Sequence, residues 1–242
     1  MRAVEVAVDL CREGLVDGMV TAPINKEAIW LGGYRTPGHT EFIAQRVGAD
    51  QHLMMMVADE LRVGLVTGHV PLADVPAGIT QKSVLQRLRV IDAGLRADFA
   101  VERPRIAVLG LNPHAGDGGV LGREEIDHIL PAIKGALDEG ILAFGPFPSD
   151  GFFATGEYKH YDGVLAMYHD QGLAPFKALT FEGGVNCTIG LPIVRTSPDH
   201  GTAYAIAGQN KARPGSMRAA LFLAARIARR RKQKDESGLD VA

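Results

Sequence analysis

The sequence contains little of what marks several common classes of protein. Only two of its 242 residues are cysteine, and neither Cys11 nor Cys187 belongs to a C-x-x-C pair. A disulfide framework is therefore excluded, and a reducing cytoplasm is the expected location. The net charge is −2, so we expect no nucleic-acid partner. No run of about eighteen apolar residues exists to span a membrane, and no G-x-G-x-x-G or P-loop fingerprint is present.

The pattern of apolar residues predicts an α/β protein. Hydrophobic residues make up 46% of the chain, which suits one large unit or two modest lobes. Alternating strands and helices predict a three-layer, mostly parallel sheet with helices on both faces. The segment 145–161 is rich in Pro, Gly and aromatic residues and is expected to be a loop. Strands are predicted at 19–22, 54–57, 61–66, 105–109, 164–167 and 187–190, and helices at 4–11, 40–47, 82–99, 123–139 and 215–230.

Three histidines follow three of these predicted strands, each in a segment framed by glycine or proline. They are His69, His114 and His169. Side chains at the carboxyl ends of parallel strands face the ligand crevice of an open sheet, so the three imidazoles could converge on one divalent metal. A lone histidine is more often a core or surface group, but three in one context favour a catalytic metal site. Asp170 could orient His169, relay a proton, or simply cap the following turn.

Two further groups of residues suggest an anion site. Thr40 is expected to cap the helix at 40–47, with His39 and the first free backbone amides facing an anion, although capping alone is an equal alternative. Downstream, Lys177, Asn186 and Arg195 combine two cations with an amide. That combination suits a phosphate and a carboxylate, whereas the alternative is ordinary surface charge.

Four spaced motifs together resemble one enzyme family. Residues 37–42, 110–116, 165–173 and 190–203 closely resemble segments of the 4-hydroxythreonine-4-phosphate dehydrogenase (PdxA) family of vitamin B6 biosynthesis. The resemblance runs from Met1 to about residue 230, and it implies a two-lobed fold like that of isocitrate and isopropylmalate dehydrogenases. Residues 1–30 with 190–242 would form a truncated cofactor-side lobe. Residues 31–189 would form the lobe that binds metal and substrate and carries the dimer interface.

The resemblance also implies an activity and a set of site residues. Family members use NAD and a divalent metal (Zn, Mg, Mn or Co) to oxidise and decarboxylate 4-phosphohydroxy-L-threonine to 3-amino-2-oxopropyl phosphate. The implied homodimer shares its metal site across the interface, with His169 coming from the opposite subunit. The implied roles are metal ligands, His69, His114 and His169; substrate binding, His39, Thr40, Lys177, Asn186 and Arg195; catalysis, Lys26 and Asp170; and NAD binding, Asp199, His200, Gly201, Thr202 and Ala203.

The sequence departs from the family at its front. Family members normally begin with a further strand and a glycine-rich Gly-x-Pro-x-Gly-Ile-Gly-Pro-Glu turn, and this motif occurs nowhere here. We therefore expect the NAD site to lack one wall. Two other functions stay open. One is a dehydrogenase for a related acid such as D-threonate or D-erythronate 4-phosphate, and the other is a metal- and phosphate-binding homologue without turnover.

Overall fold

The chain divides into two compact units, of which the first uses both ends of the sequence. The computed structural model describes residues 1–36, 38–180 and 183–237, so Pro37 of the motif at 37–42 lies outside the described residues. The first unit is Met1–Met54 with Glu182–Ala242, and the second is Met55–Phe181. Residues 31–54 therefore belong to the terminal unit, and the predicted division into a cofactor-side lobe and a metal- and substrate-binding lobe stays a prediction.

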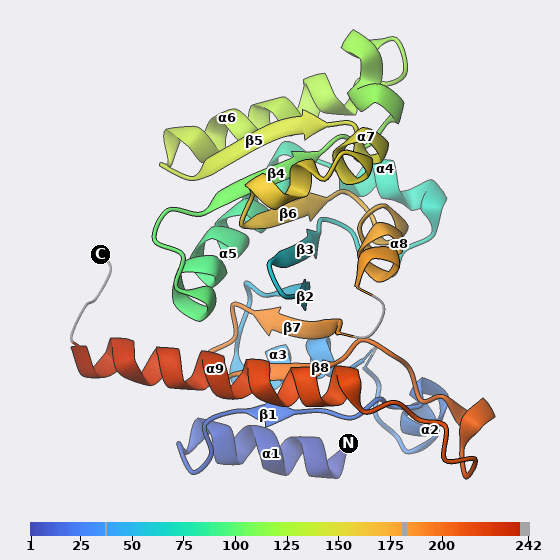
Figure 1. The fold of residues 1–242 in the computed structure, drawn as a ribbon, viewed down its shortest axis with the longest axis vertical. Helices are drawn as coiled ribbons and strands as arrows, with labels where there is room; N and C mark the ends of the chain where they lie inside the picture. Colours follow the sequence, from blue (N-terminus) through green and yellow to red (C-terminus); the bar gives the residue numbers. More distant parts are fainter. Residues whose placement is uncertain (37, 181–182, 238–242) are drawn as a thin grey trace. The chain divides into compact units, whose positions relative to one another are not determined.

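The terminal unit is built around three short strands. Its elements are α1 (Arg2–Arg12), β1 (Met19–Val20), α2 (Lys26–Leu31), α3 (His39–Val47), β7 (Val185–Ile189), β8 (Arg195–Pro198), η5 (Tyr204–Ile206) and α9 (Gly215–Ser237). β1 pairs with β8 in parallel, and β8 pairs with β7 in antiparallel orientation. Helix α9 packs on these strands, as Figure 1 shows. Strand β8 was not predicted, because its sequence is polar although all four of its residues are buried.

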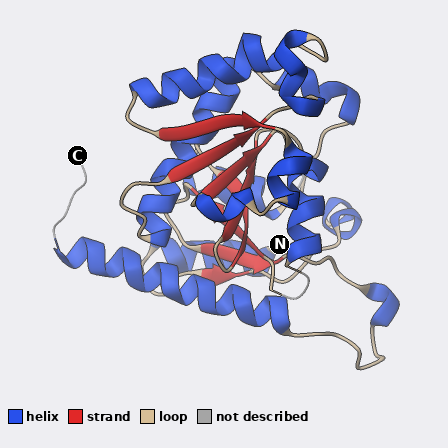
Figure 2. Cartoon of the chain, turned by 45° about the horizontal axis from the view of Figure 1, so that its top comes forward, coloured by secondary structure: helices blue, strands red, loops and turns tan. Residues whose placement is uncertain are grey.

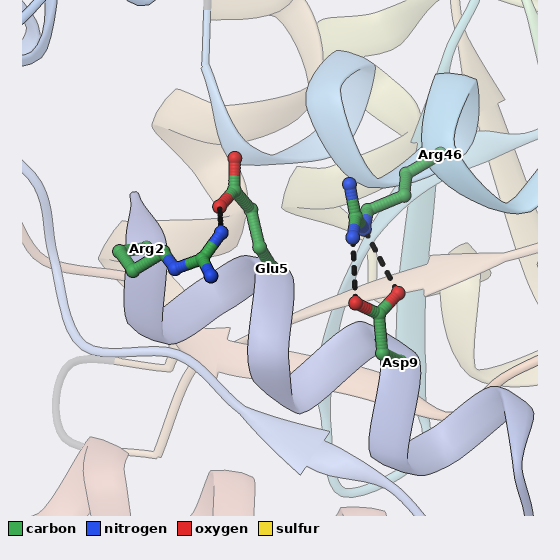
Figure 3. Close-up of polar contacts among 4 residues, drawn as sticks. All are labelled: Arg2, Glu5, Asp9 and Arg46. Atoms are coloured by element: carbon green, nitrogen blue, oxygen red, sulfur yellow. Dashed lines mark hydrogen bonds and ion pairs between the residues drawn. The ribbon is translucent and has the colours of Figure 1, made fainter.

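Helix α3 joins this unit through α1. Val8 of α1 and Ile43 of α3 are fully buried in one apolar cluster with Met19. At the edge of that cluster, Arg46 of α3 donates two hydrogen bonds to the carboxylate of Asp9 on α1, at 3.0 and 2.6 Å (Figure 3). These contacts are the physical reason that the boundary lies beyond α3 rather than at residue 31, since sequence periodicity does not reveal which helix packs on which.

The second unit contains a larger sheet (Figure 2). Its elements are β2 (Leu53–Ala58, which begins in the terminal unit), β3 (Leu61–Leu65), η1 (Leu72–Asp74), α4 (Val75–Gly78), α5 (Gln81–Phe99), β4 (Arg105–Leu109), η2 (Pro113–Gly119), the π-helix η3 (Glu125–Ile129), α6 (Leu130–Asp138), β5 (Leu142–Phe147), α7 (Ser149–Ala154), η4 (Glu157–His160), β6 (Gly163–Ala166) and α8 (His169–Leu179). The strand order is β2-β3-β6-β4-β5. All neighbours are parallel except β2 and β3, which form a hairpin. The α/β class predicted from the sequence is therefore confirmed.

Helices cover both faces of this sheet. A Cβ added to Gly163 of β6 would lie 3.2 Å from Leu95 of α5, whereas one added to Gly172 of α8 would lie 3.0 Å from Ala166 of β6. Residues 163 and 166 point to opposite faces of a strand, so α5 and α8 lie on opposite sides. The predicted loop at 145–161 is wrong in part, because it contains the end of β5, α7 and η4. Within the described ranges, no helix is both long and apolar enough to cross a membrane.

Candidate functional site

The three histidines lie beyond the carboxyl ends of three adjacent strands, as predicted. β3 pairs with β6, and β6 with β4, all in parallel. His69 follows β3, His169 begins α8 directly after β6, and His114 lies in η2 after β4. The sheet therefore delivers all three imidazoles to one edge of the second unit, which is where open parallel sheets bind ligands.

His69 and His169 lie side by side in the same chain. Thr67 donates its backbone N–H and its hydroxyl to the carbonyl of Met167, at 3.1 and 2.8 Å, and this links the two segments that carry the rings. The ring centroids are 5.3 Å apart. Nδ1 of His169 lies 2.7 Å from Oδ1 of Asp170, which as a carboxylate accepts the hydrogen bond. Asp170 thus orients the His169 ring and leaves its other nitrogen available.

His114 lies in a backbone turn of unusual conformation. Residues 114–119 all have positive φ, including His114 (52°), Ala115 (51°) and Asp117 (43°). Left-handed backbone is unfavourable for residues with a Cβ, so the surrounding structure must hold this turn in place. The exposed His114 side chain lines a cavity of about 540 Å³ whose wall carries polar and aromatic groups. The cavity residues are Leu111, Asn112, Pro113, His114, Ser149, Asp150, Phe153, Tyr168, Asp170, Gln171 and Pro175.

The chain brings two of the three imidazoles together but not all three. Within residues 1–36, 38–180 and 183–237, no three side chains of His, Cys, Asp or Glu are placed to hold a metal ion. The sharing of a metal site between subunits, with His169 from the opposite chain, stays a prediction. The close approach of His69 and His169 within one chain needs no second subunit.

A buried guanidinium is the main polar feature of the terminal unit. Arg195 is only 3% exposed. Its Nη1 donates to the hydroxyl of Thr188 at 3.0 Å, and its Nη2 donates to that of Thr21 at 2.9 Å, while its Nε has no hydrogen-bond partner among the described residues. Burial lowers the pKa of Arg195 to about 10, although Cys187 and Glu41 partly oppose this. A cation held by neutral hydroxyls and not by a carboxylate is prepared to receive an anion.

His39 and Asn186 face the same side as Arg195. Thr196 donates to the backbone of Ala220 in α9, so its neighbour Arg195 points to the opposite face of β8, toward α3. Burial and the charge of Arg195 lower the pKa of His39 to about 4, which keeps this imidazole neutral. Asn186, which is paired with Ser197 on β8, has a buried Oδ1 to which no residue that the structure describes donates a hydrogen bond. We call His39, Asn186 and Arg195, with the hydroxyls of Thr21 and Thr188, the Arg195 cluster.

The predicted cap at Thr40 is wrong. Helix α3 begins at His39, and Gly38 precedes it with no side-chain cap. Thr40 is therefore in the first turn of the helix and half-buried, where its backbone N–H is among those that no helical carbonyl satisfies. The alternative that this segment serves capping alone is not supported.

The remaining predicted residues are not gathered into the Arg195 cluster. Lys26 is exposed at the start of α2, and Lys177 is exposed on α8 in the other unit; in the part of the chain that the structure describes, neither side chain makes a hydrogen bond or ion pair. In the predicted NAD segment, the backbone N–H of Asp199 donates to the Ser216 hydroxyl at 3.1 Å. The rest of that segment is exposed, namely His200, Gly201, Thr202 and Ala203.

Several supporting residues were not identified from the sequence. Thr21 and Thr188 hold Arg195, while Glu125 and Gln171 support the histidine segments of the second unit. Glu125 is 2% exposed and Gln171 is 9% exposed. Such residues are mostly found at the surface, so composition gives no signal for their burial. For Glu125, the sequence shows only that it follows the glycine-rich segment carrying His114, which its side chain contacts.

Known proteins match this chain over nearly all its length. The family model described as pyridoxal phosphate biosynthetic protein PdxA matches residues 1–224. The chain belongs to the PdxA family. A 4-hydroxythreonine-4-phosphate dehydrogenase of Bacteroides thetaiotaomicron is 50% identical over 233 residues, which cover 96% of this chain and 64% of the relative. The predicted family is therefore confirmed.

Solved structures of PdxA proteins have the same fold. The 4-hydroxythreonine-4-phosphate dehydrogenase of Klebsiella pneumoniae matches with a TM-score of 0.85 and 42% identity, over 94% of this chain and 68% of that one. An isocitrate dehydrogenase from Methylococcus capsulatus matches with a TM-score of 0.52 and 14% identity, over 90% of this chain and 71% of that one, which shows a shared fold. The chain thus spans about two thirds of the length of its relatives.

Proposed function

We propose that this PdxA-family chain is an NAD- and divalent-metal-dependent 4-hydroxythreonine-4-phosphate dehydrogenase. It would oxidise and decarboxylate 4-phosphohydroxy-L-threonine to 3-amino-2-oxopropyl phosphate in vitamin B6 biosynthesis. The names of the similar proteins support the reaction. The chain has only two cysteines, which favours a reducing compartment, and we infer the cytoplasm.

The observation that carries the proposal is the buried Arg195. An uncompensated guanidinium costs folding free energy, and a protein retains it where an anionic ligand supplies the missing charge. Thr21 and Thr188 fix its direction, so its Nε and fork are oriented before the ligand arrives. We assign the substrate phosphate to the Arg195 cluster, with the first-turn amides of α3 at His39 and Thr40 as further donors. Lys177, in the other unit, stays a candidate substrate-binding residue, and Lys26 stays a candidate catalytic or carboxylate-binding residue.

The donor chemistry of the second unit suits a metal. Paired imidazoles, one of them hydrogen-bonded to a carboxylate, are ligands typical of zinc or cobalt. We propose that His69, His114 and His169 hold the metal. When bound, the metal would supply a Lewis acid for the substrate hydroxyl, and NAD on the segment from Asp199 to Ala203 would accept the hydride. The exposed peptide groups of that segment are compatible with a dinucleotide.

A homodimer with a shared metal site accounts for the incomplete set of ligands. Among the described residues of one chain, the three imidazoles are not gathered at one point. We propose that the set is completed across the dimer interface, with His169 coming from the opposite subunit to His69 and His114. The apolar side chains exposed near His114 and along the following helices support such an interface, and they include Val120, Leu121, Ile126, Leu130 and Leu137.

A substrate panel tests the proposal and separates the alternatives. NADH formation would be measured with 4-phosphohydroxy-L-threonine, D-threonate 4-phosphate and D-erythronate 4-phosphate at equal concentrations. We expect the highest kcat/KM for the amino substrate, since a pocket that hydrogen-bonds an amine loses binding when that group is absent. Preference for a hydroxy acid would reassign the substrate. Binding without turnover of any of the three would favour the homologue without dehydrogenase activity.

A further inference from the structure

Glu125 places a buried carboxylate against the segment that carries His114. It begins the π-helix η3 and is 2% exposed. Oε1 accepts hydrogen bonds from the backbone N–H groups of Leu111 and Asn112, at 2.7 and 2.8 Å. Oε2 accepts a third hydrogen bond from Nδ2 of Asn112 at 2.9 Å. The backbone that leads from β4 to His114 is thus held by one side chain.

The glycines of the segment fit closely around this carboxylate. A Cβ on Gly116 would lie 2.6 Å from Oε2 of Glu125, and one on Gly110 would lie 3.1 Å from Oε1. Gly116 also has a φ of 82°, within the run of left-handed residues that begins at His114. The hydrogen bonds and this close packing offset the unfavourable backbone of the turn, since such strain persists only where the surroundings fix it.

Gln171 holds the same segment from the other side. It is 9% exposed and lies in the first turn of α8, two positions after His169. Its Nε2 donates to the carbonyl of Gly110 at 2.5 Å, and its Oε1 accepts from the backbone N–H of Met167 at 2.7 Å. One side chain therefore joins the end of β4 to the end of β6, from which His114 and His169 project.

We propose that Glu125 and Gln171 are positioning residues: Glu125 holds the turn that carries His114, and Gln171 ties that turn to the segment that carries His169. Neither touches a reacting atom; each acts through the backbone at positions 110–112. The inference rests on the proposed function in that it takes His114 and His169 as metal ligands. Residues that orient metal ligands typically change metal affinity about 10- to 100-fold when they are replaced.

Two nearly isosteric substitutions test this in the full chain. Glu125→Gln replaces an acceptor with a donor opposite Nδ2 of Asn112, and Gln171→Glu places a carboxylate opposite the Gly110 carbonyl. Glu139→Gln is the matched control, because Glu139 lies in the same unit and its carboxylate accepts hydrogen bonds from the surface Arg89. Three quantities would be measured: backbone amide exchange at Leu111 and Asn112, Zn²⁺ or Co²⁺ affinity by calorimetry, and kcat with KM.

We expect faster exchange at both amides, metal affinity weakened about tenfold or more, and a lower kcat with unchanged KM in both variants. The control should match the wild type. Faster exchange with unchanged metal affinity and kcat would overturn the positioning role and leave a purely structural one. Unchanged exchange would also overturn it. If the wild-type chain binds metal but forms no NADH, the proposed function is refuted, while amide exchange and metal affinity still test the positioning role. If the wild-type chain binds no metal, both the proposed function and the positioning role are overturned. If Glu125→Gln does not fold, Gln171→Glu decides.

Discussion

Nη2 of Arg195 donates a 2.9 Å hydrogen bond to the hydroxyl of Thr21, which lies 174 positions earlier in the chain. This bond joins β8 to the residue that follows β1, and with the Thr188 bond it aligns a guanidinium that is almost fully buried. Because neither partner is charged, the positive charge of Arg195 stays available for a ligand.

Arg195→Lys should weaken substrate binding strongly while the protein stays folded. Lysine keeps the charge but loses the fork that bonds to Thr21 and Thr188. Hydrogen bonds to charged groups contribute about 1.5–3 kcal/mol, so the Kd for 4-phosphohydroxy-L-threonine should rise by about 10- to 100-fold. Calorimetric titration measures this, with Arg89→Lys in the other unit as the control. Equal Kd values for the two variants would remove Arg195 from the phosphate site.

His39 should make the protein less stable in mild acid. Its pKa of about 4 in the fold lies below the ordinary histidine pKa of 6.5, because of burial and the nearby Arg195. The unfolded chain therefore binds more protons between these values, and the free energy of unfolding falls as pH drops through this window, by at most about 1.4 kcal/mol per pH unit.

Denaturant unfolding at several pH values checks this effect. The wild-type curve would be compared with that of His39→Gln, whose side chain does not titrate. We expect the difference between the two curves to grow as pH falls from about 6.5 toward 4. Parallel curves would mean that His39 gains its proton in the folded protein as readily as in the unfolded chain.

Asp170→Asn should lower metal affinity more than Asp150→Asn. Both carboxylates line the cavity beside His114, but only Asp170 bonds to a predicted ligand, at 2.7 Å from Nδ1 of His169. Loss of the carboxylate charge makes the His169 imidazole less basic and therefore a weaker metal ligand, and we expect the affinity for Zn²⁺ to fall by about 10-fold or more. Competition with a metal-sensitive dye gives both affinities. A larger loss of affinity in Asp150→Asn would show that Asp150, and not Asp170, orients the metal ligand.

Gly116→Ala and Gly118→Ala form a matched pair in the His114 turn. Both glycines have positive φ, at 82° and 64°, but only at Gly116 would a Cβ meet Glu125, while nothing lies within 4 Å of one at Gly118. Alanine at Gly118 should cost about 1–2 kcal/mol of stability for the left-handed backbone alone. The clash should add about 1–3 kcal/mol at Gly116. Thermal unfolding measures both, and equal losses would show that Glu125 does not hold the turn tightly.

The sequence predicted the placement of the histidines well because strand ends leave a local signal. Apolar runs followed by glycine and proline located β3, β4 and β6, and the parallel pairing then followed from the alternation with helices. The residue types alone left Arg195 and Asn186 between an anion site and ordinary surface charge, because the burial of Arg195 depends on contacts with Thr21 and Thr188 that no local pattern encodes.

Other elements were missed for identifiable reasons. Helix α8 contains Gly172 and Pro175, which lower helix propensity, yet it forms because Gly172 allows close packing on Val63 and Leu65 of β3. Strand β8 is short and polar, and β5 runs into Gly145 and Pro146. In each case tertiary contacts decide the structure against the local preference.

Metal-dependent formation of NADH tests the central claim most directly. The 242-residue chain would receive 4-phosphohydroxy-L-threonine and NAD after treatment with a chelator, and then again after Zn²⁺, Co²⁺, Mn²⁺ or Mg²⁺ is restored. We expect no turnover in the chelated protein and recovery with at least one of these metals. Turnover that persists unchanged after full removal of metal would contradict the assignment of His69, His114 and His169. No turnover under any condition, with substrate still bound, would contradict the dehydrogenase itself.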